Sequence, residues 1–146
     1  MEIDKKKFLT KYLVGACLES FGIKNQFLEL SFSSKDHDNI GFSVDCKITT
    51  NDQIINEKAL YFKNIHSDVY EIIYFIKANL IEVKNYSFKD KIFSIFFAND
   101  YVISFHLNSE EESPLSISFR KIYTDKNYIS LEFGNNGDFE IFEIAL

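Results

Sequence analysis

The chain contains one pattern twice: a helical stretch that passes into alternating apolar and polar residues. Tyr70 to Val83 repeats the pattern of Phe8 to Phe21 at a constant offset of 62, which follows from 70 − 8. At this offset Tyr12 corresponds to Tyr74. Periodicity of this kind is the main sequence signal for secondary structure, and each copy predicts one helix followed by a β-meander.

Two helices are predicted, one at the start of each copy. The first runs from the N-cap Asp4 to Gly15, and the second begins at the N-cap Ser67. Apolar residues three and four apart form one stripe along each helix. These residues are Phe8, Leu9, Tyr12, Leu13 and Ala16 in the first helix, and Val69, Ile72, Ile73 and Ile76 in the second.

About nine short strands are predicted from strict alternation of apolar and polar residues. The clearest is Ile40 to Ile48, and its polar face predicts an antiparallel sheet, because parallel strands are buried on both faces. The other strands are 16–23, Leu28 to Phe32, Leu80 to Tyr86, Ile92 to Ala98, Tyr101 to Leu107, 115–119, 129–133 and 139–141. Ile54 to Phe62 is a weaker extended segment whose alternation is blurred.

The predicted fold is α+β, with two helix-plus-antiparallel-β-meander pseudo-repeats packed into one strand-rich body. A chain of 146 residues, 46% apolar and 16% aromatic, has material for a single core. We therefore expect a single domain, 1–146, with pseudo-repeats at 4–50 and 66–108 and C-terminal strands within 115–145.

The charge and the apolar runs exclude several classes of protein. A net charge of −6 disfavours nucleic acid as a partner, because phosphate binding needs clustered Lys and Arg. Thr10 and Lys11 interrupt the first apolar run, so no signal peptide is predicted. No apolar run has the length of a membrane span, and we expect a cytoplasmic protein without membrane contact.

Cysteine and histidine residues are not grouped in a way that predicts chemistry. Cys17 and Cys46 lie among apolar neighbours and are interpreted as reduced core thiols. Asp36, His37 and Asp38 share one short polar loop, which favours a solvated loop over a metal site. No nucleophile, phosphate-loop or zinc motif is present, so we predict neither an enzyme nor a cofactor.

Acidic loops and outward aromatic residues are the candidates for binding a partner. An acidic rim around exposed aromatic side chains is typical of a protein that binds a basic partner. The acidic candidates are Glu110, Glu111 and Glu112 in one loop, and Asp36, Asp38 and Asp45 around the first meander. The others are Tyr86, predicted at a turn, and Phe96 and His106 on outward strand faces.

In its organisation the chain resembles the immunity proteins that protect bacteria from polymorphic toxins, including those of contact-dependent growth inhibition. The resemblance rests on residues 12–21, which contain Leu13-Val14-Gly15, and on the alternating strands 27–32 and 40–46 that follow. A second helix and another meander then complete the likeness over nearly the whole chain. Lys77 departs from the pattern, since the first copy has Gly15 at that position.

The resemblance implies a protein that binds one cognate toxin domain, often a basic nuclease, and blocks its active site or its substrate access. Two other functions are compatible with the residues. The space between the meanders could hold a small ligand or an enzymatic site, and an exposed sheet edge could pair with a second copy of the chain.

Overall fold

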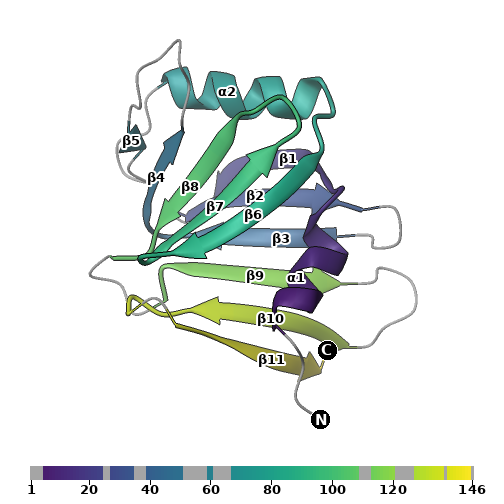
Figure 1. Cartoon of the computed structure of the whole chain (residues 1–146), viewed down its shortest axis with the longest axis vertical. Coiled ribbons are helices and arrows are strands. Elements are labelled where there is room, and N and C mark those ends of the chain that lie inside the picture. The colour runs from purple at the N-terminus through teal and green to yellow at the C-terminus, as the bar shows by residue number, and fades with distance from the viewer. Residues whose placement is uncertain are drawn as a thin grey trace.

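The computed structural model describes residues 5–24, 27–34, 39–50, 59–60, 67–108, 113–120, 127–136 and 138–145. These residues form two antiparallel sheets and two helices (Figure 1). The elements are α1 (Lys5–Leu13), β1 (Cys17–Lys24), β2 (Phe27–Ser33), β3 (Asn39–Val44), β4 (Lys47–Thr50), β5 (Ala59–Leu60), α2 (Ser67–Ala78), β6 (Val83–Lys89), β7 (Ile92–Phe97), β8 (Val102–His106), β9 (Leu115–Arg120), β10 (Asn127–Phe133) and β11 (Phe139–Ala145).

Each predicted meander supplies three strands to a different sheet. The strand predicted at Ile40 to Ile48 is divided between the sheets, because β3 lies in sheet A and β4 in sheet B. Sheet A has the strand order β1-β2-β3-β9-β10-β11, and sheet B has the order β5-β4-β8-β7-β6. The three C-terminal strands extend the first meander, because β9 pairs antiparallel with β3. Sheet B and α1 lie on the same side of sheet A, and α2 crosses the strand ends of sheet B and packs against β1 (Figure 1).

Apolar residues at alternate strand positions fill the interior between the sheets. The rings of Phe32 and Phe97 lie 6.5 Å apart, and those of Phe42 and Phe105 lie 5.7 Å apart, so side chains of the two sheets meet directly. Tyr12 of α1 packs on Phe119 at 5.7 Å. The described part of this interior is therefore packed core, which gives no support to a ligand site between the meanders.

The two sheets are joined where the two units begin. Cys17 and Glu82 form an antiparallel bridge, the amide of Gly15 donates to the carbonyl of Val83, and the amide of Val83 donates to the carbonyl of Ala16. These bonds tie the start of β1 to the start of β6, at one corner of the sandwich.

The first two strands of each unit pair with a similar register, but the difference in residue number between the two units is not constant. The helices begin 62 residues apart, at Lys5 and Ser67. The register then shifts between Leu18 and Ser20 in one unit and between Val83 and Asn85 in the other, which is an offset of 65 (83 − 18). The difference arises because α2 has 12 residues and α1 has 9. Whether the whole units superpose stays a prediction.

The end of α2 explains why the predicted strand boundary was wrong. The amide of Ile81 donates to the carbonyl of Ile76 and that of Leu80 to Lys77, which is the Schellman arrangement. Leu80 takes the left-handed conformation, φ 50°, that Gly15 takes after α1, φ 90°. Leu80, and not Lys77, is thus the counterpart of Gly15, and the strand predicted at Leu80 to Tyr86 is β6, starting at Val83.

Two further predictions are corrected or remain open. Tyr86 and Phe88 lie inside β6 and not at a turn, because the chain turns at Asp90 and Lys91, both with positive φ. Of the predicted strand Ile54 to Phe62 the structure describes only Ala59–Leu60, and Asp4 lies outside the described residues. Neither described helix is long and apolar enough to cross a membrane.

Candidate functional site

The described elements leave the outer face of the six-stranded sheet A uncovered (Figure 1). Sheet B and α1 cover only the opposite face of this sheet, and no described element crosses the outer one (Figure 1). Alternation along each strand fills this face with small and polar side chains, while their apolar neighbours point into the core. The face is therefore free for a partner over six strands.

One cross-strand row on this face consists almost entirely of serine and glycine. Directly paired positions run from β1 to β11 in the order Ser20, Ser31, Gly41, Ser118, Ser130 and Phe142. Because these side chains are short, the surface over the middle strands is recessed, whereas Phe142 is exposed at the edge of the sheet.

The adjacent row is acidic. Its paired positions are Gly22, Glu29, Ser43, Ser116, Glu132 and Glu140. Glu29 and Glu140 are exposed, and Glu132 is half-buried. Glu132 lies directly opposite Glu140, and like charges in such a pair repel each other across the sheet. A cation placed over this pair would relieve the repulsion.

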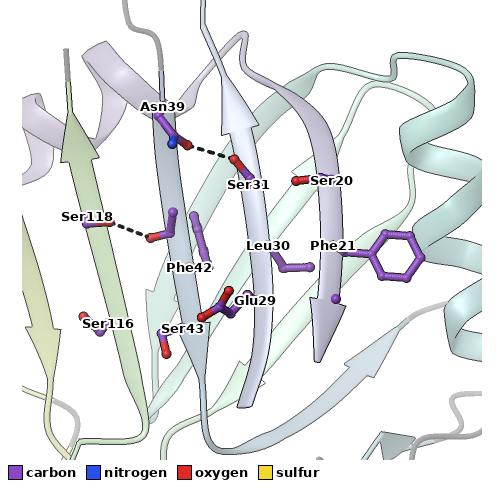
Figure 2. Close-up of a pocket in the computed structure, with 12 residues that line it drawn as sticks. Ser20, Phe21, Glu29, Leu30, Ser31, Asn39, Phe42, Ser43, Ser116 and Ser118 are labelled. Carbon is purple, nitrogen blue, oxygen red and sulfur yellow. Dashed lines mark hydrogen bonds between the residues drawn. The ribbon is translucent and has the colours of Figure 1, made fainter. Parts of the chain in front are cut away.

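Together the two rows enclose a shallow trough of about 510 Å³ over β1, β2, β3 and β9. Figure 2 shows its serine side chains on four neighbouring strands, with Glu29 beside them. A second hollow of about 480 Å³ lies near the β10–β11 turn and is lined by Glu132, Asp138, Glu140 and Phe142 among others. Glu132 links the acidic row to this second hollow.

Hydrogen bonds fix several hydroxyl groups of the trough. Ser116 and Ser130 both donate to the same oxygen of Glu132, at 2.9 and 2.7 Å. Ser31 donates to the side chain of Asn39 at 2.8 Å (Figure 2). A Cβ at Gly41 would lie 3.0 Å from Oγ of Ser118, so glycine here lets the two strands keep this close contact. The Glu132 carboxylate is oriented before any partner binds.

The described lysine and glutamate side chains are distributed unequally over the molecule. On the outer face of sheet A, the charged residues among the described side chains are the glutamates of the acidic row, with Asp138 at the adjoining turn. The lysines with described side chains lie instead on the helices, sheet B and its turns: Lys6, Lys7, Lys11, Lys47, Lys77, Lys84, Lys89 and Lys91. The described side chains on the outer face of sheet A therefore carry only negative charge.

Of the acidic residues predicted from the loops, the structure describes only Asp45. Glu110, Glu111, Glu112, Asp36 and Asp38 lie outside the described residues. Asp45 is half-buried between β3 and β4, and its amide donates to the carbonyl of Pro114 at 2.8 Å. Its backbone holds the β3–β4 connection against the start of β9.

Tyr86 has a structural position that the sequence did not indicate. Its hydroxyl donates to the carbonyl of Lys6 at 2.8 Å and lies 3.2 Å from Oγ1 of Thr10. Its ring stacks on Phe93 at 6.1 Å. Tyr86 thus holds α1 against sheet B.

Phe96 and His106 point outward as predicted, but from sheet B, on the side opposite the acidic row. Phe96 is half-buried between Ile95 and Phe97, which point inward. Nε2 of His106 lies 2.8 Å from Oγ1 of Thr49. Burial, and then the charge of Lys47, lowers the pKa of His106. These two residues do not join the acidic candidates in one site.

The two cysteines are free thiols, and only one is a core residue. Cys46 is buried, whereas Cys17 is half-buried at the sheet junction and donates to the carbonyl of Leu80 at 3.5 Å. Burial and then the charges of Glu82 and Glu19 raise the pKa of Cys17. The prediction of a core thiol is therefore wrong for Cys17 and correct for Cys46. No metal-ligand cluster occurs among the described residues.

No protein family, curated protein or solved structure matches the chain. The candidate site therefore rests on the geometry of sheet A. Sequence reasoning missed the serines of this face, although the signal is visible in Ser116 and Ser118, at alternate positions of the strand predicted at 115–119. Their positions beside Ser43 and Gly41 depend on the pairing of β3 with β9, across a long sequence separation.

Proposed function

We propose that this chain is an immunity protein that binds a cognate toxin domain, a basic nuclease, through the outer face of sheet A. The observation that carries the proposal is the acidic row of Glu29, Glu132 and Glu140 beside an open trough. The organisation that the chain shares with immunity proteins supports the same function. We place the protein in the cytoplasm, where such a toxin would act.

Electrostatics favour a basic domain as the partner. A nuclease needs Lys and Arg at its phosphate-binding surface, and complementary charge accelerates encounter and rejects wrong partners. The acidic row would meet such a surface directly, while the lysines of the helices and sheet B lie elsewhere. Occupation of the toxin's phosphate-binding residues would block access of its substrate.

The shape of the face favours long side chains on the partner. The serine and glycine residues at the centre leave room above the sheet, which Arg or Lys side chains could fill. Glu132 is already oriented by Ser116 and Ser130, so less ordering of this carboxylate is needed on binding. We expect Glu132 and Glu140 to receive the same cationic side chain.

Co-expression with the toxin domain encoded beside this gene tests the proposal. The wild-type chain should bind the domain in a pull-down and protect cell growth. Reversing both exposed glutamates, Glu29→Lys with Glu140→Lys, should slow association by about ten-fold at low salt, and by less at high salt.

Two further variants separate charge from shape. Glu82→Lys reverses an exposed charge at the junction with sheet B and should leave association nearly unchanged. Ser43→Trp fills the trough and should accelerate dissociation. The proposal is wrong if the wild-type chain neither binds nor protects against this domain, or if the control variant weakens binding as much as the double reversal.

A further inference from the structure

The molecule has four sheet edges, formed by β1 and β11 in sheet A and by β5 and β6 in sheet B. An edge strand has unpaired amide and carbonyl groups, and proteins usually protect it by shortness, bulges, lysine residues or a covering element. The four edges differ sharply in such protection.

Three edges carry protective features. β1 has a register shift between Leu18 and Ser20 and packs against α2. β6 has a register shift between Val83 and Asn85, and it carries lysines. β5 has only 2 residues. None of these edges offers a long and regular line of backbone groups.

β11 lacks all of these features. It pairs with β10 over all 7 residues without a register shift. Its sequence, FEIFEIA, contains neither lysine nor proline. No described element covers its other side.

The direction of the free groups on β11 follows from the adjoining turn. The amide of Gly134 donates to the carbonyl of Asp138, so these residues form a hydrogen-bonded pair. Bonded and non-bonded pairs alternate along an antiparallel ladder, which makes Glu140 and Phe142 the bonded positions on β11. The backbone groups of Ile141 and Glu143 therefore face away from β10.

The acidic row specifies which strand fits this edge. Outward side chains of an added strand would lie opposite Glu140 and Phe142, with Glu132 one strand further in. Opposite charges at directly paired positions stabilise a sheet. A second copy of β11 would bring glutamates but no cation to pair with them, since its sequence is FEIFEIA. A basic strand with an apolar residue two positions from its cation fits best.

We propose that β11 is a docking edge for an extended, Lys- or Arg-bearing strand of the partner, bound through the backbone of Ile141 and Glu143. This inference rests on the proposed function and adds to it how the partner is held. Main-chain hydrogen bonds would supply affinity, and the acidic row would select the basic side chains.

A synthetic peptide of repeating Lys-Thr-Val-Thr, blocked at both ends, serves as the probe, because it places lysine and valine two positions apart on one face. Added to the ¹⁵N-labelled full chain, it should shift the amide signals of Ile141 and Glu143 and slow their hydrogen exchange. The same peptide with alternating D-residues cannot form a regular strand and should not produce these changes.

Matched variants at one position separate pairing from charge. Glu143→Pro removes an edge-facing amide and should weaken peptide binding by about ten-fold, the equivalent of one or two hydrogen bonds. Glu143→Gln keeps the amide and should weaken binding only about two-fold, because it removes a charge without removing a main-chain hydrogen bond. The amide signals of β10 report whether each variant keeps its fold.

The inference is overturned if the L-peptide does not bind, if both variants bind it equally, or if it shifts only trough residues. Dimerisation of the chain through β11 in the absence of peptide would instead show that this edge pairs with a second copy of the chain. The two proposals fail separately. A toxin complex insensitive to Glu143→Pro contradicts only the docking edge, whereas absence of any toxin complex contradicts the proposed function and leaves the peptide result standing.

Discussion

At the scale of single residues, Cys46 shows how burial makes stability depend on pH. Burial, with a contribution from Asp45, raises the pKa of this thiol from its ordinary 9.0 to about 12. The unfolded chain thus loses the thiol proton before the folded chain does. The resulting stabilisation is complete below pH 9.0 and is lost as the pH rises toward 12.

We expect the free energy of unfolding to fall by up to about 1.4 kcal/mol per pH unit above this point because of Cys46 alone. Urea unfolding of the wild-type chain and Cys46→Ala at several values of pH measures the effect. The difference in stability between the two should shrink as the pH rises. A difference independent of pH would contradict the role given to this thiol.

Leu80 combines an unfavourable backbone conformation with an exposed side chain. Its φ is 50° and its side chain is 68% exposed. The backbone conformation is therefore unfavourable, and little burial of apolar surface offsets it. Leu80→Gly should raise the free energy of unfolding by roughly 0.5–1 kcal/mol, after allowance for the greater freedom of glycine in the unfolded chain. Leu80→Ala keeps the strain and should give no gain in thermal unfolding.

At the scale of secondary structure, the periodicity of apolar residues predicted the elements better than turn residues predicted their boundaries. The existence of the two helices, the antiparallel meanders and the inward residues of β7 and β8 followed from periodicity alone. The start of β6 did not, because Leu80 occupies a conformation that glycine usually takes, and no glycine marked the end of α2. The candidate site could not be predicted, since it depends on which strands become neighbours.

The hydroxyl group of Tyr86 links β6 to α1. Tyr86→Phe removes the hydrogen bond to the carbonyl of Lys6 and should lower the free energy of unfolding by about 1 kcal/mol. Amide exchange in α1 should accelerate with it. Tyr74→Phe alters a side chain that is 60% exposed and serves as the control, with no expected change.

At the scale of the whole molecule, sheet A combines the first meander with the C-terminal strands. β9 covers the edge of β3 and contributes Leu115 and Ile117 to the core. The N-terminal 108 residues therefore contain both meanders but only half of the strands of sheet A.

A chain ending at Asn108 should fail to unfold cooperatively and should aggregate, because β3 then presents an uncovered edge and the core loses the buried residues of β9 and β10. A chain ending at Asp138 keeps β9 and β10 and should remain folded, with lower stability. Denaturant unfolding and sedimentation compare the two. Cooperative unfolding of the shorter chain would show that the meanders form an independent domain.

Strict alternation along the strands of sheet A gives the protein two sets of residues that can change independently in evolution. Ile117 belongs to the core, while its neighbours Ser116 and Ser118 face outward. A substitution in the outward set would alter what the face can recognise and leave the packing between the sheets untouched. Diversity of recognition can thus accumulate on this side of the fold at little expense to its stability.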